Sequence, residues 1–343
     1  MPYHRIAVGT DGSATAAIAE KVAGQLAKAI DAELMIVTVT DSEDTDAAAI
    51  LRDAEARAGQ LGVTPTTKTL SGDAASGIME AAEEGRADLV VVGDRGMGEV
   101  RRFSLGAIPD QVAHSSPVDM LVVRTTRPEA RERAASYRRV LIATDGSFTA
   151  YQAAGRGFAL ASALGAEITL VYVGDELIGD IVLRDTAQRF GDEGIGRRVL
   201  KGKPSERIIN LAADEAHDLV VVGNKGMQAR RRLMRQVVPD QLAHRASCDV
   251  LISKTVGRSL HDLQPGEGGI IDVGGQKVAA FFDDQGNIYT VSARCQHLGC
   301  TVGWNSRTRT WDCPCHGSRY DYKGAVLNGP TTKPLPPVDV ANL

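Results

Sequence analysis

Short apolar runs rich in Val, Ile and Leu alternate with longer Ala-rich stretches over the first 255 residues. Between the runs, Ala16–Ala29 and Ala74–Glu84 carry apolar residues at helical spacing. Near-continuous apolar strands that alternate with helices are typical of a parallel sheet covered on both faces. We therefore predict a doubly wound α/β fold. The expected strands are 5–10, 33–39, 65–70, 89–92 and 119–123, then 139–144, 167–173, 196–200, 219–222 and 250–253.

The pattern is duplicated, because three blocks recur in the same order about 130 residues apart. These blocks are RIAVGTDGS at 5–13 and RVLIATDGS at 139–147, LVVVGDRGM at 89–97 and LVVVGNKGM at 219–227, and PDQVAH at 109–114 and PDQLAH at 239–244. We predict two copies of one domain that pair with each other as a pseudodimer.

The pattern changes from about Ser259. Helical periodicity disappears, and short strands at 269–273, 277–283 and 288–292 are separated by Gly and Asp turns. This is typical of a small antiparallel β domain. The expected organisation is therefore a first α/β domain at 1–126, a linker at 127–137, a second α/β domain at 138–256 and an all-β domain at 257–343.

The composition of the chain argues against several classes of function. Hydrophobic residues make up 43% and charged residues 24% of the chain, and 39 Lys+Arg against 43 Asp+Glu give a net charge of −4. The chain carries no large excess of positive charge, so its composition does not indicate a nucleic-acid partner. No apolar run approaches the roughly 20 residues of a membrane span, and the N-terminus does not read as a secretory leader. We expect a soluble cytoplasmic protein.

Four of the five cysteines lie between 295 and 315, so cysteine chemistry belongs to the β domain. They form two boxes, Cys295-Gln-His297-Leu-Gly-Cys300 and Cys313-Pro-Cys315-His316-Gly-Ser318. The order Cys-x-His, fifteen residues, then Cys-x-x-His resembles the ligand pattern of a Rieske [2Fe–2S] centre. The region 259–340 as a whole resembles a Rieske domain of the high-potential type.

The resemblance implies that Cys295 and Cys313 bind one iron through thiolates, while His297 and His316 bind the other through neutral imidazoles. Neutral ligands make the cluster less negative, which raises the reduction potential to about −150 to +300 mV from about −400 mV for plant-type ferredoxins. Imidazoles that face solvent would also couple reduction to proton uptake near neutral pH.

Other positions match the same family. Ser318 and Tyr320 stand where hydroxyls donate hydrogen bonds to the cluster and to the cysteine sulfurs. Cys300 and Cys315 match the pair that forms a disulfide between the two cluster loops, and 328–336 resembles the loop that covers the cluster. A structural zinc site is the alternative for the Cys and His boxes. It would not require Ser318, Tyr320 or the additional cysteine pair.

The duplicated blocks resemble the universal stress protein family over about 3–125 and 138–255. Nucleotide-binding members carry Gly-x-x-Gly, nine residues, then Gly-Ser/Thr, and the first copy reads Gly93-x-x-Gly96, nine residues, Gly106-Ala. Glycines of this kind let backbone N–H groups approach a phosphate.

Asp11 and Val39 match the adenosine contacts of that family, so the resemblance implies an ATP site in the first domain. Two departures weaken it. Ala107 stands where a hydroxyl is expected, and in the second copy Gln236 occupies the third glycine position.

Together these features predict a one-electron carrier built on a pseudodimeric docking platform. Expected partners are a dehydrogenase or similar oxidoreductase and an acceptor such as respiratory quinone, in a homo-oligomer or a complex that is peripheral to a membrane. The main alternative is a signalling module that responds to nucleotide and redox state. A quinol-oxidising subunit of a cytochrome bc-like complex and an oxygenase ferredoxin are further alternatives. The first normally has a membrane anchor, and the second generally lacks the additional cysteine pair.

Overall fold

A computed structural model places most of the chain in two compact units, Met1–Thr255 and Val256–Leu343. Each unit is described by itself. The structure describes residues 2–40, 46–95, 106–116, 118–125, 137–191, 194–224, 237–254, 263, 265–273, 276–297, 299–313 and 317–340.

The first copy alternates strands and helices as the sequence predicts. Side chains cap its first three helices, because Ser13, Asp46 and Asp73 each accept a hydrogen bond from a backbone N–H in the first turn. The elements are β1 (Arg5–Thr10), α1 (Ala14–Ile30), β2 (Glu33–Thr40), α2 (Ala47–Gln60), β3 (Thr66–Ser71), α3 (Ala74–Glu84), β4 (Leu89–Gly93), α4 (Ala107–Ser115) and β5 (Asp119–Val123).

The second copy repeats this order. Its elements are β6 (Arg139–Ala143), α6 (Phe148–Leu164), β7 (Glu167–Val173), α7 (Glu176–Phe190), β8 (Gly196–Leu200), α8 (Pro204–Asp214), β9 (Leu219–Gly223), α10 (Val238–Arg245) and β10 (Asp249–Ser253).

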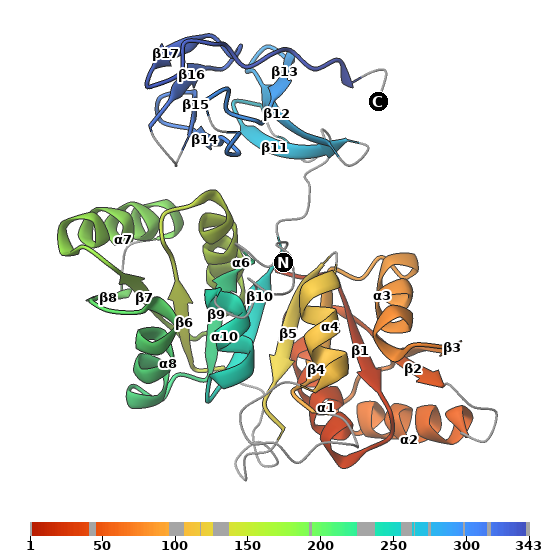
Figure 1. Ribbon diagram of the computed structural model, residues 1–343. Coiled ribbons are helices and arrows are strands. Elements are labelled where there is room, and N and C mark those ends of the chain that lie inside the picture. Colours follow the sequence, from red (N-terminus) through yellow and green to blue (C-terminus); the bar gives the residue numbers. More distant parts are fainter. Residues whose placement is uncertain are drawn as a thin grey trace. The chain divides into compact units, whose positions relative to one another are not determined.

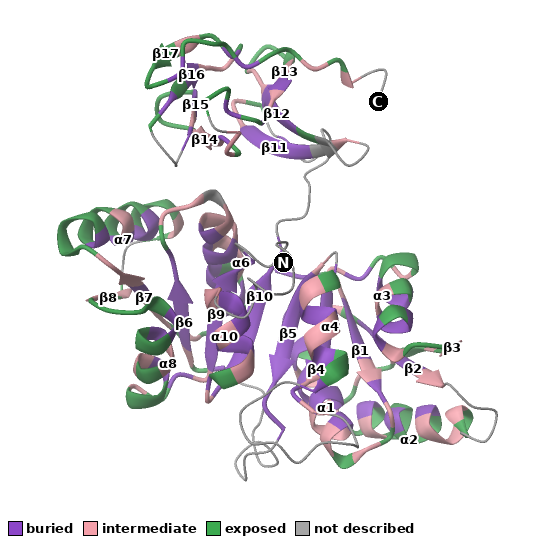
Figure 2. Ribbon diagram, in the orientation of Figure 1, coloured by how far each residue is buried: buried purple, intermediate pink, exposed green. Residues whose placement is uncertain are grey.

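All ten strands join one sheet in the order β3-β2-β1-β4-β5-β10-β9-β6-β7-β8 (Figure 1). Within each copy the strands are parallel, and β5 pairs antiparallel with β10 where the copies meet. The central strands are buried from both sides, as Figure 2 shows, whereas the edge strands β3 and β8 have no buried residue. One core packs under α1, α2, α6 and α7 and another under α3, α4, α8 and α10. The predicted doubly wound pseudodimer is confirmed.

We call the β5–β10 junction the seam. Two buried aspartates fix it symmetrically. Asp249 accepts from the backbone N–H of Arg124 at 2.9 Å, and Asp119 accepts from the backbone N–H of Lys254 at 2.7 Å. The Arg124 guanidinium also donates to the carbonyls of Leu242 and Ala243 at the end of α10. Each domain thus forms hydrogen bonds with backbone groups at the end of a strand or a helix of the other domain.

A second contact across the seam joins α4 to α10. Asp110 and His114 are four residues apart on α4, and Asp240 and His244 occupy the same places on α10. Each histidine approaches an aspartate of its own helix and one of the other helix. We call these four residues the seam ring.

The seam ring makes stability depend on pH. Contacts with Asp110, and then with Asp240, raise the pKa of both His114 and His244 from 6.5 to about 9. The histidines also hold the pKa of Asp110 below its ordinary value.

We expect the free energy of unfolding to decrease as pH rises from 6.5 to about 9. A histidine whose pKa is raised in the folded protein contributes its full stabilisation below the pKa of the unfolded chain. That stabilisation is lost as the pH rises through the pKa of the folded protein. The expected loss is on the order of 2–3 kcal/mol, because the half-exposed Asp110 weakens the contact. Urea unfolding at several pH values measures it. The double variant His114→Gln/His244→Gln should lack this dependence, and an unchanged slope would contradict it.

The second unit contains two small antiparallel sheets. The first is β11 (Gly268–Val273), β12 (Gln276–Phe282) and β13 (Ile288–Ser292), and the second is β14 (Gly303–Asn305), β15 (Thr310–Asp312), β16 (Arg319–Asp321) and β17 (Val326–Asn328). Aromatic rings form the core between them. Phe281 stacks on Trp304 at a centroid distance of 4.7 Å, and the fully buried Trp311 lies 4.7 Å from Trp304. This rigid core carries the two loops that follow β13 and β15.

Candidate metal centre

The loop after β13 folds around Cys295. The backbone N–H of Cys295 donates to the carbonyl of Cys300 at 2.8 Å, and the Cys295 carbonyl accepts from the N–H of Gly299 at 2.9 Å. Gly299 has φ +75°, which favours glycine. The turn buries the Cys295 side chain and leaves His297 exposed.

The loop after β15 repeats this geometry around Cys313. The N–H of Cys313 donates to the carbonyl of Ser318 at 2.7 Å, and its carbonyl accepts from the N–H of Gly317 at 3.1 Å. Gly317 also has φ +75°. Two equivalent turns therefore each present one buried cysteine, and both Cys295 and Cys313 are thiols.

Tyr320 on β16 connects the loops. Its hydroxyl lies 3.1 Å from the Cys295 Sγ and accepts from the backbone N–H of Gln296 at 3.2 Å. A hydroxyl that already accepts an N–H has its own proton available for the sulfur. The phenol therefore donates to Cys295.

The surroundings of Cys295 favour a thiolate. Burial raises the pKa of its thiol. Hydrogen bonds from the Tyr320 hydroxyl and the His297 N–H, with the nearby Cys313 and Ser318 side chains, outweigh burial and hold the pKa below its ordinary value. A thiolate is the form in which cysteine binds a metal.

Ser318 supplies a test of whether an iron–sulfur cluster fits. Its side chain is 1% exposed, and among the described residues its Oγ has no hydrogen-bond partner of normal geometry. A buried hydroxyl without an acceptor costs free energy. A sulfur atom of an iron–sulfur cluster would supply such an acceptor, and the buried Cys295 thiol lies beside the side chains of both Ser318 and Cys313. The residues present fit a [2Fe–2S] cluster.

A third segment packs against the second loop. Gly329 follows β17 with φ +120°, and a Cβ at this position would lie 2.3 Å from the Ser318 Cα. Thr331, in the same segment, is buried and its side chain contacts the Tyr320 hydroxyl. Of the other predicted site residues, His316 and Cys315 lie outside the described residues, so the Cys300–Cys315 disulfide and the fourth ligand remain predictions.

The residues predicted for a nucleotide lie at the carboxyl edge of the first copy. Asp11 follows β1, and its Oδ1 accepts from the backbone N–H of Ser13 at 2.9 Å. Gly93 ends the neighbouring strand β4, and a Cβ there would lie 3.6 Å from the Thr15 carbonyl at the start of α1. Gly106 is the N-cap of α4 and has no side-chain cap.

Val39, on the other side of β1, faces α3, since a Cβ on Gly77 would lie 2.8 Å from one of its methyl groups. Gly96 lies outside the described residues, as does Gln236 in the second copy. The structure therefore brings Asp11, Gly93 and Gly106 to one edge of the sheet.

Comparison with known proteins agrees with the fold. The universal stress protein family model matches residues 2–124, 136–180 and 176–254. The chain belongs to the universal stress protein family. A solved universal stress protein of Archaeoglobus fulgidus, 18% identical, superimposes with a TM-score of 0.61 over 73% of this chain and 98% of that chain. At this identity the likeness concerns the fold alone.

The remainder of this universal stress protein is a Rieske [2Fe-2S] domain, whose family model matches residues 254–339. YhfW of Bacillus subtilis, named a Rieske 2Fe-2S iron-sulfur protein, is 47% identical over 79 residues, or 23% of this chain and 16% of that protein. A cytochrome b6-f complex iron-sulfur subunit of Nostoc sp. is 54% identical over 46 residues, or 13% of this chain and 26% of that subunit. The matched segments thus span about a quarter or less of these curated relatives.

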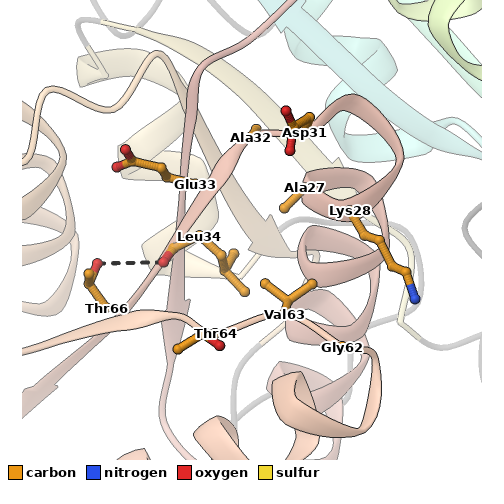
Figure 3. A pocket seen from close by; sticks show the side chains of 10 residues that line it. All are labelled: Ala27, Lys28, Asp31, Ala32, Glu33, Leu34, Gly62, Val63, Thr64 and Thr66. Carbon is orange, nitrogen blue, oxygen red and sulfur yellow. Dashed lines mark hydrogen bonds between the residues drawn. The ribbon is translucent and has the colours of Figure 1, made fainter.

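One pocket of this universal stress protein lies at the opposite edge of the sheet from the residues predicted for a nucleotide. It has a volume of about 300 Å³ and lies beside the start of β2, at the amino edge of the sheet (Figure 3). Its lining is Ala27, Lys28, Asp31, Ala32, Glu33, Leu34, Gly62, Val63, Thr64 and Thr66. Separately, no helix in the described ranges has the length and apolarity to cross a membrane.

Sequence reasoning missed two features of the centre. The equivalence of the turns at Cys295 and Cys313 was readable in principle, because each cysteine is followed four residues later by Gly299 or Gly317. The close packing of Gly329 on Ser318 had no local signal, because it depends on how β16 and β17 pair.

Proposed function

We propose that this chain is a one-electron carrier whose Rieske domain has a high reduction potential, and whose universal stress protein domains dock it to a partner oxidoreductase. The observation that carries the proposal is the environment of Cys295, which has a phenol donor at 3.1 Å and the buried Ser318 hydroxyl beside it. When bound, a Rieske cluster accepts and releases one electron. Donors aimed at its sulfurs stabilise the reduced, more negative state and so raise the potential.

The chain's own residues would control access and protons. His297 is exposed, so a partner or quinone that docks there would meet an imidazole at the surface. An exposed imidazole near a reduced cluster is suited to hold a proton that accompanies the electron. The donor is proposed as a dehydrogenase-like protein and the acceptor as a quinone, with a cytoplasmic location.

An EPR-monitored redox titration of the anaerobically purified chain at two pH values tests this proposal. We expect a rhombic reduced [2Fe–2S] signal with a positive potential that increases as pH falls. Absence of that signal, with one zinc and no iron per chain, would overturn it.

Tyr320→Phe should lower the potential by several tens of mV. The variant removes one hydrogen bond to sulfur, worth about 0.5–1.5 kcal/mol, and about 59 mV corresponds to a tenfold change for one electron. The matched control is Tyr322→Phe, since Tyr322 packs its ring on Phe281 in the aromatic core. The same titration measures both variants. Equal potentials for Tyr320→Phe and the wild type would show that the phenol does not act on the cluster.

A second candidate function is nucleotide-dependent regulation through the first domain. Its specific support is that Gly93 and Gly106 line one sheet edge beside Asp11, with Gly106 opening α4 without a side-chain cap. Such a helix start favours phosphate.

Gly106→Gln should abolish ATP binding by the first domain while the fold is retained. A Cβ at Gly106 meets only ordinary contacts, 3.6 Å from Pro109 and 3.7 Å from the Arg95 Cα. The longer side chain would instead fill the approach to the helix start. Calorimetry with Mg-ATP measures affinity, and a circular dichroism melt checks folding. Binding that persists in the variant would place any nucleotide elsewhere.

A further inference from the structure

An acidic residue stands at the sheet edge where the second candidate function places a phosphate. Asp94 directly follows Gly93 at the end of β4, whereas the second copy has Asn224 at the equivalent place after β9. Like charges repel, so a carboxylate exposed here would oppose a bound phosphate. The direction of the Asp94 side chain therefore decides whether this edge suits an anion.

The Asp94 side chain is turned into the protein. It is 7% exposed, and its Oδ1 accepts from the Thr125 backbone N–H at 3.0 Å and from the Thr125 hydroxyl at 2.6 Å. Thr125 follows β5, the strand that pairs with β4, and is itself buried. Two donors on one oxygen hold the carboxylate in the interior rather than at the surface of the edge.

Positive charge from the seam faces the same carboxylate. The Arg124 Nη1 lies 3.8 Å from the Asp94 Oδ2, and both side chains are 7% exposed. The Nε and Nη2 of Arg124 donate to backbone carbonyls of the second domain, those of Leu242, Ala243 and Cys248. Because both charged groups are shielded from bulk water, the guanidinium offsets much of the negative charge of the carboxylate.

The backbone of Asp94 anchors the two glycines of this edge. Its N–H donates to the Val123 carbonyl at 2.8 Å, and its carbonyl accepts from the Gly106 N–H at 3.0 Å. Asp94 thus joins the end of β4, where Gly93 lies, to the start of α4, where Gly106 is the N-cap. Since the Asp94 side chain is fixed by its own partners, the separation of the two glycines is fixed with it.

We propose that Asp94 is a positioning residue for nucleotide binding by the first domain, held in place by Thr125 and Arg124. It sets Gly93 and Gly106 for a phosphate and keeps its own charge away from that phosphate. The inference rests on the nucleotide function proposed above. Because the remaining donors of Arg124 are bound by the second domain, that domain supports the site in the first.

The test measures the binding of Mg-ATP and of adenosine to the full-length protein by equilibrium dialysis. Asp94→Ala should lower the affinity for Mg-ATP more than about tenfold, because the buried donors of Thr125 lose their acceptor and the anchor is released. Adenosine has no phosphate, so its affinity should not change. Asp94→Asn keeps an acceptor oxygen and should remain within about threefold of the wild type for Mg-ATP.

Thr125→Val is a second variant in case Asp94→Ala does not fold. It removes the hydroxyl donor but keeps a methyl group near Gly93, and it should weaken Mg-ATP binding without changing adenosine binding. The matched control is Asn224→Ala, which makes the same truncation at the buried equivalent position of the second copy. That control should leave the binding of both ligands unchanged.

The outcomes separate this inference from the function on which it rests. A wild-type protein that binds no Mg-ATP would overturn both. If the wild type binds Mg-ATP and Asp94→Ala binds it equally well, the nucleotide function stands and Asp94 does not position the site. Equal losses of Mg-ATP and adenosine affinity, or a loss in Asp94→Asn as large as in Asp94→Ala, would also overturn the positioning role.

Discussion

Gly329→Ala should deprive the Rieske domain of its cluster, whereas Gly286→Ala should leave it intact. A Cβ on Gly329 would lie 2.3 Å from the Cα and 2.9 Å from the backbone nitrogen of Ser318. Those atoms belong to the turn that holds Cys313, and a backbone cannot move aside as a flexible side chain does. The added methyl group must therefore displace either the covering segment or the cluster loop.

Gly286 is a strict control because it shares the conformational cost without the clash. Its φ is +90°, against +120° for Gly329, and a Cβ there would meet nothing within 4 Å. Alanine at a positive φ costs about 1–3 kcal/mol by itself. Both variants carry that conformational cost, so the difference between their iron contents measures the effect of the contact with Ser318.

The measurements are iron content, the reduced EPR signal and the thermal unfolding of the Rieske domain. We expect less than about a tenth of the wild-type iron in Gly329→Ala and near-normal iron in Gly286→Ala, since a steric conflict adds several kcal/mol to the strain. Equal iron in the two variants would show that the covering segment yields freely and does not fix the loop.

His297→Cys should lower the reduction potential by an amount on the order of hundreds of mV. The variant replaces a neutral ligand with an anionic thiolate, and the range for centres with two histidines lies well above the roughly −400 mV of all-cysteine ferredoxins. The added negative charge opposes the arrival of an electron. Potential and EPR line shape are read from the assembled fraction, so partial loss of iron does not obscure the result.

Gln296→Cys is the control for this variant. It places a new thiol one residue earlier. The native Gln296 side chain is exposed, and its amide donates to the Arg294 carbonyl. A thiol at this position should leave the potential unchanged. If His297→Cys also left it unchanged, residue 297 would not be a ligand, and the order of ligands assigned to the first box would be wrong.

The central strands were predictable because they are buried from both sides. Segments such as Leu89–Val92 and Leu219–Val222 carry an apolar residue at every position, and this pattern depends little on neighbours. The three-residue strands β14 to β17 were not predicted. They are too short for any periodicity, and their pairing is set by the aromatic core around Trp311.

The candidate centre was predictable where its ligand residues follow a fixed spacing along the chain. The boxes around Cys295 and Cys313 carry their own pattern, whereas the contact of Tyr320 on β16 with the Cys295 sulfur, in the loop after β13, depends on how the two small sheets pack together. The seam ring shows the opposite case. Its Asp-x-x-x-His segments were visible as a repeat, but they converge only because β5 pairs antiparallel with β10. That arrangement is a property of the pair of domains.

The pairing of β5 with β10 also bears on how this protein can change over time. In a symmetric homodimer every substitution at the junction appears twice, on both sides at once. Here the two sides are encoded separately, and one side presents Arg124 to the end of α10 while the other presents Lys254 to Ala113. Because the partner is always tethered, a weakened contact on one side is tolerated through high effective concentration. One universal stress protein domain can therefore acquire a new function while the other continues to stabilise it.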